Sequence, residues 1–321
     1  MFAAYAARID KDRPLDGLEL GERPEPNVPD GWTTVDVKAA SLNHHDLWSL
    51  RGVGLGEKSL PMILGCDAAG VDPEGNEVVL HSVIGATGHG VGPDERPSIL
   101  TEKYQGTFAE RVAVPRWNLL PKPPELSFAE AACLPTAWLT AYRMLFTNAG
   151  VRPGDSVLVQ GAGGGVATAA IVLGAAAGLR VFATSRDETK RQRAVELGAE
   201  AAVESGARLP QRVDAVLETV GAATWSHSLK SLKPGGTVVI SGATTGPNPP
   251  AAELNRVFFL ELKIVGSTMG SKEELASLLS FCAAKGVRPV VDSTLPLDRA
   301  REGFERMAEG ELFGKIVLTA E

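Results

Sequence analysis

Cysteines are scarce in this 321-residue sequence, and no two lie close together. Cys66, Cys133 and Cys282 are odd in number and far apart, so they provide no framework of disulfide bonds. The simplest interpretation is three buried free thiols in a reducing compartment, which favours a cytoplasmic protein. The N-terminal segment has no basic stretch followed by an apolar one, so we expect no secretory signal.

Positive charge and aromatic residues are also in short supply. The chain has 32 lysines and arginines against 39 aspartates and glutamates, which gives a net charge of −7. That balance argues against general binding to nucleic acid or to an anionic membrane. Aromatic residues make up 6% and hydrophobic residues 44%, as in an ordinary globular enzyme with a large core. The length suits two domains.

Residues 156–179 contain no charged residue, and a stretch of this length could span a membrane. The stretch also contains six glycines, however, together with Gln160 and Thr168. It divides into a β-type run, a glycine turn and an alanine-rich helical pattern. A buried strand and helix explain this division better than a membrane span, so we predict no membrane partner.

The rhythm of the sequence changes near a proline-rich segment at 120–127. Before it, short β-type runs alternate with proline and glycine breaks. After it come a helical pattern that ends at Gly150 and then a repeated alternation of strand and helix. This alternation is typical of a parallel sheet with crossover helices, so we predict the α/β class with a doubly wound parallel sheet.

The strand at 156–160 leads into the glycine turn, and a helix follows. Glycines allow positive φ and let the backbone approach a ligand closely, while the helix N-terminus favours a pyrophosphate. The usual G-x-G-x-x-G spacing is not kept, because Val166 stands where the third glycine belongs and Ala167 takes the small position. A purely structural turn is the alternative, but the repeated βα setting favours a dinucleotide. The predicted phosphate-binding residues are Gly161, Gly163, Gly164, Gly165 and Val166.

The end of the next strand indicates which dinucleotide is bound. In NAD-binding proteins an acidic residue about 20 positions after the turn binds the ribose 2′-hydroxyl. Here Ser185 stands at that position, with Arg186 next to it and Lys190 one helical turn on. A hydroxyl and two cations suit a 2′-phosphate, so we predict NADPH. Acids follow at 187 and 188, but the first turn of a helix favours acids for its own dipole. The alternative is a solvated helix face of mixed charge.

Several segments together resemble the medium-chain dehydrogenase/reductase superfamily over nearly the whole chain, most closely its zinc-independent quinone oxidoreductase-like branch. They are SLNHHDLWSLRG (41–52), PMILGCDAAGV (61–71), GTFAERVAVP (106–115), LPTAWLTAYRML (134–145), the glycine turn, LKPGGTVVISGATTG (232–246) and FGKIVL (313–318).

This resemblance implies a mainly β GroES-like catalytic domain at 1–125, to which 260–321 returns in part, and a Rossmann domain at 126–259. It also implies a cleft between the domains that holds the nicotinamide, and a homodimer formed through edge strands of the Rossmann sheet. Family positions near the cofactor correspond to Thr140, Gly242, Ala243, Thr244, Met269 and Lys315.

Zinc alcohol dehydrogenases of the superfamily carry a cysteine, a His-Glu pair and a second cysteine at three places in this alignment. The corresponding residues here are Asn43, the pair Cys66-Asp67 and a position near Thr136. Catalytic zinc takes three ligands of the Cys, His or carboxylate type, and only Cys66 is a good one. The four-cysteine structural zinc site is absent as well, so we predict no metal.

Four histidines bear on this prediction. His44 and His45 are adjacent, so their side chains are expected to diverge, and only an unusual arrangement would let them rescue a zinc site. His81 and His89 lie in a loop-rich stretch and are interpreted as surface or packing residues.

A site without zinc lacks the Lewis acid that helps to deprotonate an alcohol. We therefore predict an NADPH-dependent reductase that transfers hydride to a quinone or to an α,β-unsaturated carbonyl compound. Asn43 is the predicted donor to the developing enolate oxygen. Asp46 either orients neighbours or relays a proton, or is a structural acid at a helix start. The alternatives are an alcohol dehydrogenase with a degenerate zinc site and a non-catalytic NADPH-binding or sensing protein.

Overall fold

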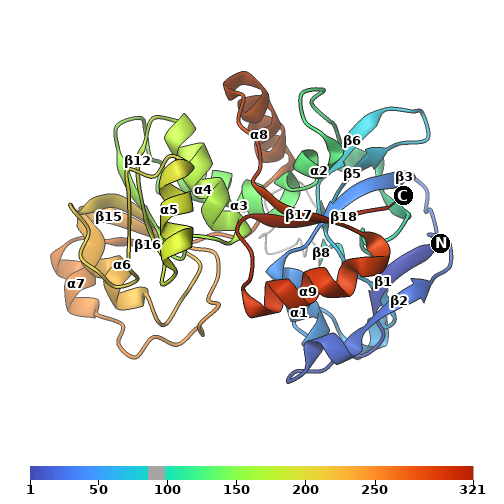
Figure 1. Cartoon of the computed structure of the whole chain (residues 1–321), viewed down its shortest axis with the longest axis horizontal. Helices are drawn as coiled ribbons and strands as arrows, with labels where there is room; N and C mark the ends of the chain where they lie inside the picture. Colours follow the sequence, from blue (N-terminus) through green and yellow to red (C-terminus); the bar gives the residue numbers. More distant parts are fainter. Residues whose placement is uncertain (86–97, 321) are drawn as a thin grey trace. The chain divides into compact units, whose positions relative to one another are not determined.

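The computed structural model describes residues 1–85 and 98–320 of the chain (Figure 1). The chain divides into two compact units. Unit 1 consists of Met1–Leu139 and Gly270–Glu321, and unit 2 consists of Thr140–Met269.

These boundaries differ from the predicted ones at both ends of unit 2. Residues 126–139 belong to unit 1, because α2 (Phe128–Ala131) packs against the strands of that unit. Residues 260–269 belong to unit 2, because β16 (Lys263–Gly266) pairs with the sheet of that unit. Proline-rich composition marked the end of a strand region here and not the end of the folded unit.

Unit 1 is mainly β. Its strands are β1 (Phe2–Ala6), β2 (Leu18–Glu22), β3 (Trp32–Ser41), β4 (Met62–Ile63), β5 (Asp67–Val71), β6 (Glu77–Leu80), β7 (Val83–Ile84), β8 (Ser98–Ile99), β9 (Arg111–Pro115), β10 (Leu119–Pro121), β17 (Val291–Pro296) and β18 (Lys315–Thr319). Its α-helices are α1 (His44–Leu50), α2, α8 (Lys272–Lys285) and α9 (Ala300–Glu309), with short 3-10 turns at Pro14–Gly17, Glu57–Ser59, Arg116–Asn118 and Leu297–Arg299.

The C-terminal segment of the chain completes the largest sheet of unit 1. Its path is β10-β6-β5-β3-β18-β17, and β9 also pairs with β3. Strand β18 lies antiparallel to β3, with Val317 opposite Ser41. This pairing brings the start of β18 to the end of β3, where α1 begins. Lys315 and the residues that follow β3 therefore become neighbours despite their separation in sequence.

Apolar side chains of this sheet and of α9 form the core of unit 1. Phe108 and Phe304 are fully buried and meet edge to face, with ring centroids 6.0 Å apart. Leu50 of α1 and Leu64 are also fully buried in this core. The core therefore fixes α1 against the sheet, and α1 carries the polar residues described below.

Unit 2 is an α/β domain. Its strands are β11 (Ser156–Val159), β12 (Arg180–Thr184), β13 (Ala201–Val203), β14 (Val213–Glu218), β15 (Leu232–Ile240) and β16. Its helices are α4 (Gly165–Ala176), α5 (Glu188–Glu196), α6 (Trp225–Ser231) and α7 (Leu254–Phe259), and α3 (Leu139–Tyr142) leads into it.

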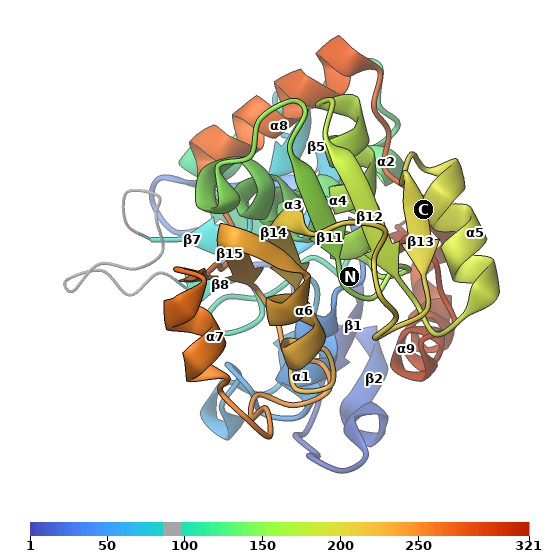
Figure 2. The ribbon, with the colours of Figure 1, turned by 90° about the vertical axis from the view of Figure 1, so that its left-hand side faces the viewer.

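The sheet of unit 2 is parallel throughout, with the order β13-β12-β11-β14-β15-β16. Figure 2 labels the first five of these strands. The chain moves outward from β11 in one direction and later from β14 in the other. Because crossovers between parallel strands are right-handed, α4 and α5 cover one face and α6 and α7 the other. The order reverses between β11 and β14, which is where doubly wound sheets bind ligands.

The predicted fold class is confirmed, including its Rossmann and GroES-like parts. The charge-free stretch at 156–179 forms β11, the glycine turn and α4, as expected. Within residues 1–85 and 98–320, no helix has both the length and the apolar composition that a membrane span requires. The helical segment before Gly150 is less regular than its pattern suggested, with π-helical stretches at Leu134–Trp138 and Arg143–Ala149.

Candidate active site

In unit 2, most of the predicted cofactor-binding residues lie at the carboxyl ends of the parallel strands. Strands in a parallel sheet end on the same side, and the predicted residues follow the ends of different strands. The glycine turn follows β11, Ser185 follows β12, and Gly242 comes soon after β15. Ala243 and Thr244 continue this last loop, and the backbone N–H of Thr244 donates to Thr219 at the end of β14.

The glycine turn has the backbone that a phosphate ligand needs. Gly161 has a φ of 78° and Gly163 a φ of 128°, which residues with side chains rarely adopt. A Cβ atom at Gly163 would also lie 2.9 Å from the side chain of Lys190. Helix α4 begins at Gly165 and has no side-chain cap, so its first N–H groups, including that of Val166, are left for an anion. The turn therefore fits a dinucleotide pyrophosphate.

The residues that follow β12 lie at the same end of the sheet, where the strands have their carboxyl ends. Ser185 is buried, and its hydroxyl accepts a hydrogen bond from the N–H of Asp187. Asp187 in turn caps α5 by accepting from the N–H of Lys190. The acid at 187 is thus explained by the helix start, as proposed for it from sequence. Arg186 is exposed to solvent at the start of this turn.

Sequence reasoning missed a further basic residue here. The Arg191 guanidinium donates to the backbone carbonyl of Ser185 at 2.8 Å, so it lies beside the predicted 2′-phosphate position. The only sequence signal for it is the excess of basic residues at 186–193, which does not say which of them turn toward the strand end.

A buried polar network supports the glycine turn and was also missed. The Thr184 hydroxyl donates to Gln160 Oε1 at 2.7 Å and accepts from the N–H of Gly161 at 3.2 Å. Gln160 Nε2 contacts His227 and Ser228, both at 2.9 Å. The network connects the ends of β11 and β12 to α6. These buried side chains therefore stabilise the conformation of the glycine turn.

Two other predicted residues of unit 2 stand apart from this description. Thr140 is buried on α3, at the start of the unit. Met269 follows β16 and has a φ of 44°, which is unusual for a residue with a side chain. The cofactor roles of both residues stay predictions.

In unit 1, a buried ammonium group organises the other predicted residues. Lys315 is 3% exposed, and its Nζ donates to the Leu42 carbonyl and to Asn43 Oδ1, each at 2.6 Å. Its third neighbour is Asp67 Oδ2 at 3.5 Å. All three N–H bonds of the ammonium thus have protein acceptors. These contacts place the ammonium among acceptors of unit 1, and its role at the cofactor stays a prediction.

The orientation of Asn43 follows from this contact. An ammonium group can only donate, so Oδ1 must face Lys315 and the amide nitrogen must point the other way. Nδ2 then lies 2.8 Å from Asp67 Oδ2, 3.2 Å from the Ser41 carbonyl and 3.7 Å from Cys66 Sγ. Both of its hydrogens are directed at buried acceptors. Asn43 is therefore not placed as the free donor that we predicted for an enolate oxygen.

Asp46 occupies the structural position that was one of its two predicted roles. Its carboxylate accepts from the N–H of Asn43 at 2.8 Å and from the N–H of Gly65 at 3.1 Å, and the side chain is fully buried. It completes the capping arrangement at the start of α1. Burial raises the pKa of Asp46 to about 7, against the opposing effect of these hydrogen bonds.

The three positions that correspond to zinc ligands converge in the structure. Cys66 Sγ lies 3.7 Å from Asn43 Nδ2 and 3.5 Å from the Thr136 hydroxyl. The donor set does not fit zinc, however. Asn43 turns N–H bonds toward the centre, Thr136 offers only a neutral hydroxyl, and burial raises the pKa of the Cys66 thiol well above its usual value. The adjacent ammonium of Lys315 would repel a cation.

The histidines do not supply the missing ligands. In the described ranges, no group of three or more His, Cys, Asp or Glu side chains is arranged to hold a metal. His81 is buried, and its Nε2 contacts the Gly270 carbonyl at 2.9 Å, so packing explains it. His89 lies outside the described residues. His45 contacts Thr101 and Ser49, a contact that sequence reasoning did not foresee.

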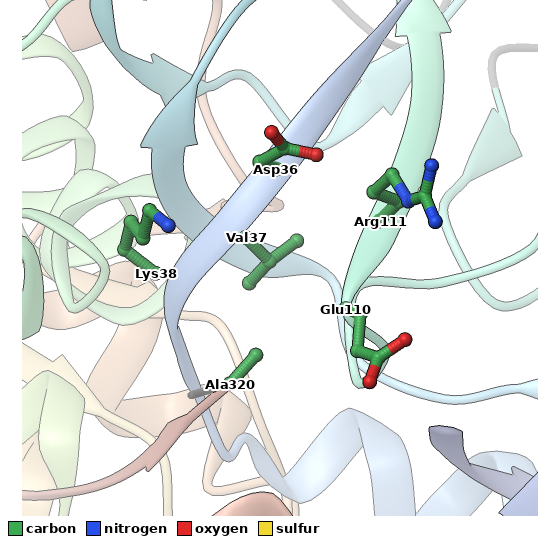
Figure 3. Close-up of a pocket in the computed structure, with 6 residues that line it drawn as sticks. All are labelled: Asp36, Val37, Lys38, Glu110, Arg111 and Ala320. Atoms are coloured by element: carbon green, nitrogen blue, oxygen red, sulfur yellow. The ribbon is translucent and has the colours of Figure 1, made fainter. Parts of the chain in front are cut away.

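A shallow pocket elsewhere on unit 1 is a poor alternative site. Figure 3 shows the residues that line it, and they are Asp36, Val37, Lys38, Glu110, Arg111 and Ala320. Its two acids and two bases lie on adjacent strands, and Arg111 is already paired with Glu25 at 2.8 Å. Mixed, solvent-accessible charge does not define a particular ligand, so the buried cluster around Lys315 is the better candidate.

Two family profiles match this chain. One is described as an alcohol dehydrogenase GroES-like domain and matches residues 29–124. The other is described as a zinc-binding dehydrogenase and matches residues 165–284. A zinc-type alcohol dehydrogenase-like protein of Schizosaccharomyces pombe is 30% identical, with 90% of each chain covered. An acryloyl-coenzyme A reductase of Metallosphaera sedula is 27% identical over 94% of this chain and 96% of its own.

Other relatives are similar over most or all of their length. The quinone oxidoreductase of Mus musculus is 28% identical over 88% of each chain. Among solved structures, an NAD-dependent alcohol dehydrogenase is 35% identical with a TM-score of 0.90, and both chains are fully covered. Together with the two-unit fold and the glycine turn, these similarities show that the chain belongs to the medium-chain dehydrogenase/reductase superfamily.

Proposed function

We propose that this protein is an NADPH-dependent reductase that transfers hydride to a quinone or to the β-carbon of an α,β-unsaturated carbonyl compound, without zinc. One observation carries the proposal. The positions that hold zinc ligands in other members contain Asn43, Cys66 and Thr136, and a buried ammonium group is hydrogen-bonded to the first of them. Such a site lacks the Lewis acid that favours oxidation of an alcohol.

Relatives with matching names support this choice of reaction. Acryloyl-coenzyme A reductases from two organisms are each 27% identical to the chain, and the mouse quinone oxidoreductase is 28% identical. The second candidate is alcohol dehydrogenase activity, which the names of other relatives favour. The third is nucleotide binding without catalysis. The zinc-ligand positions favour the reductase over the alcohol dehydrogenase.

The proposed cofactor-binding residues are those that follow the carboxyl ends of the strands of unit 2. The N–H groups of the glycine turn and of the start of α4 would hold the pyrophosphate, and Ser185, Arg186 and Lys190 would hold a 2′-phosphate. Arg191 lies beside Ser185 and is added to this set. When bound, the reduced nicotinamide supplies the hydride.

The residues of unit 1 act on the acceptor by providing a fixed polar surface. Lys315 holds the Asn43 amide in one orientation, and the Asp67 carboxylate receives one of the amide hydrogens. Because the Lys315 ammonium lies beside the Asp67 carboxylate, their charges offset each other, and a site of little net charge suits an uncharged quinone or enone. After hydride transfer, the α-carbon of the enolate formed from an enone, or an oxygen of a reduced quinone, takes its proton from water.

We also propose a homodimer in the cytoplasm. Strand β16 is the last strand of its sheet, and Ile264 on it is 46% exposed. The adjacent helix α7 exposes Leu254, Phe258 and Phe259 at 68%, 58% and 76%. Grouped apolar exposure beside an unpaired strand edge is typical of a subunit interface. The three cysteines are free and buried, which suits a reducing compartment.

The reaction is tested by following NADPH absorbance with a panel of quinones, enals and simple ketones, before and after dialysis of the enzyme against a zinc chelator. We expect turnover of quinones or enals that survives dialysis, with substoichiometric zinc by elemental analysis. One tightly bound zinc per chain, together with loss of activity on its removal, would support the alcohol dehydrogenase. Tight NADPH binding without any turnover would support the non-catalytic protein.

The cofactor preference is tested by Arg186→Ala and Lys190→Ala. Each removes a cation that would bind the 2′-phosphate, so each should weaken NADPH binding about tenfold and leave NADH binding unchanged. Arg152→Ala is the matched control. Arg152 is exposed and precedes β11, so it lies at the amino ends of the strands, away from the proposed cofactor site. Equal binding of NADPH and NADH by the unaltered protein, measured by calorimetry, would contradict the assignment.

The interface is tested by Phe258→Glu and Phe259→Glu in one chain. Burying two carboxylates without partners is strongly unfavourable, so the double variant should be monomeric in analytical ultracentrifugation, whereas the unaltered protein sediments as a dimer. Val195→Glu, at an exposed apolar residue on α5, is the control and should leave the dimer intact. A monomeric unaltered protein would rule out the proposed homodimer.

The buried cation is tested by Lys315→Met. This change leaves Asp67 buried and without its cation, so the free energy of unfolding should fall by about 3–5 kcal/mol in urea titrations. Adding Asp67→Asn should recover part of the loss, since it removes the uncompensated charge. Arg116→Met breaks a solvent-exposed ion pair with Glu74 and should cost less than about 1 kcal/mol. An equal loss in the free energy of unfolding for Lys315→Met and Arg116→Met would show that the buried ion pair is no more important for stability than an exposed one.

A further inference from the structure

The imidazole of His45 belongs to a small group of polar side chains beside the Lys315 cluster. His45 lies two residues after Asn43 on α1. Its Nε2 is 2.9 Å from the Thr101 hydroxyl and 3.5 Å from the Ser49 hydroxyl. The two hydroxyls are 3.4 Å apart, and both residues are fully buried. Among the described residues, these three groups have no other side-chain hydrogen-bond partners.

This closed triangle determines which ring nitrogen of His45 carries the proton. Each buried hydroxyl must donate its hydrogen to an acceptor. Ser49 can donate to Thr101, and Thr101 can donate to Nε2, but only if Nε2 is unprotonated. If Nε2 carried a hydrogen, one of the two hydroxyl hydrogens would have no acceptor. The neutral ring therefore has its proton on Nδ1.

The backbone of Thr101 adopts an unfavourable conformation in the arrangement that places its hydroxyl against His45. Thr101 has a φ of 80°, a conformation that β-branched residues avoid and that costs about 1–3 kcal/mol. Its N–H donates to the Tyr104 carbonyl at 2.9 Å, which fixes the turn. A glycine or asparagine would adopt this turn with less strain. Neither would supply a hydroxyl to Nε2, and strain of this kind is concentrated at functional sites.

The other nitrogen of the ring has no partner in the described part of the chain. The ring is partly exposed, and Nδ1 is not among the buried polar atoms that lack a partner. Burial of the remainder of the ring lowers the pKa of His45 to about 4, so the imidazole is neutral near pH 7. The exposed Nδ1–H is thus a neutral donor whose direction is set by two buried hydroxyls.

We propose that the Nδ1–H of His45 donates a hydrogen bond to the carbonyl oxygen of the acceptor as that oxygen gains negative charge. The proposal rests on the reductase function above, and it replaces Asn43 as the donor, because both amide hydrogens of Asn43 have buried acceptors. No proton leaves His45 in this step. A preorganised donor aimed at a developing oxyanion contributes to the rate without accepting charge itself.

The kinetic test compares two substitutions that differ in which nitrogen they imitate. His45→Asn places an amide N–H near the position of Nδ1, whereas His45→Gln places its amide near Nε2. We expect His45→Gln to lower kcat for enone reduction about 10²-fold, and His45→Asn to retain most of the activity. The dissociation constant for NADPH should be unchanged in both variants, which a general structural defect would not produce.

The tautomer is tested separately by nitrogen-15 NMR of the imidazole groups. The chain has five histidines, and the His45 signals are assigned by their loss in His45→Asn. We expect a protonated Nδ1 and an unprotonated Nε2. Thr101→Val removes the hydroxyl that donates to Nε2 and should give a mixture of tautomers, whereas Thr101→Ser should preserve the single one.

The outcomes separate the donor role from the function on which it rests. An unaltered protein that reduces enones while His45→Gln is equally active overturns the donor role alone. A proton found on Nε2 overturns it as well, whatever the kinetics. An unaltered protein that reduces no acceptor in the panel overturns the reductase function itself, and the donor role falls with it.

Discussion

The hydrogen bonds of one buried ammonium group determine the chemistry that unit 1 can offer. Lys315 reaches Leu42 and Asn43 because β18 pairs with β3, which is a consequence of the C-terminal return. Its charge fixes the Asn43 amide, and the amide then turns its N–H bonds toward Asp67 and away from a metal-binding geometry. A positive charge on a protein side chain is thus buried beside the positions where other members of the superfamily bind zinc.

This arrangement explains why the polar residues around α1 have different roles despite their proximity. Asp46 caps the helix, Asn43 connects the ammonium to the carboxylate, and His45 turns toward two hydroxyls instead. The ring of His45 uses Nε2 for both of these contacts, which leaves Nδ1 without a partner in the described part of the chain. In unit 2 the polar groups also have two roles. Buried side chains stabilise the glycine turn, whereas backbone N–H groups of the turn and of the start of α4 are left for a ligand.

Much of unit 2 could be predicted from sequence, because its features are local. The strand, glycine turn and helix at 156–176 follow from apolar runs and glycine positions, and the residue after the next strand follows from spacing. The network that includes Gln160 and His227 could not be predicted, since it joins side chains from strands and a helix that are distant in sequence. Arg191 was missed because helical periodicity alone does not show which basic side chain bends back to the strand end.

In unit 1 the residues were found from sequence, but the contact between Asn43 and Lys315 was not foreseen. The spacing identified Asn43 and Lys315, yet the contact between them depends on the pairing of β18 with β3, which no local pattern reveals. Without that contact, Asn43 was interpreted as a free donor and Lys315 as a cofactor residue. The group formed by His45, Thr101 and Ser49 depends on a strained turn at Thr101, and sequence carries no signal for a threonine at positive φ.

The most direct test of the central claim follows the transferred hydrogen. The enzyme is incubated with NADPH deuterated at C4 and an enone in chelator-treated water, and the product is examined by NMR. A reductase that works without zinc on conjugated acceptors should place deuterium on the β-carbon and a solvent proton on the α-carbon. Deuterium on the former carbonyl carbon, with formation of an allylic alcohol, would contradict the claim and indicate alcohol dehydrogenase chemistry.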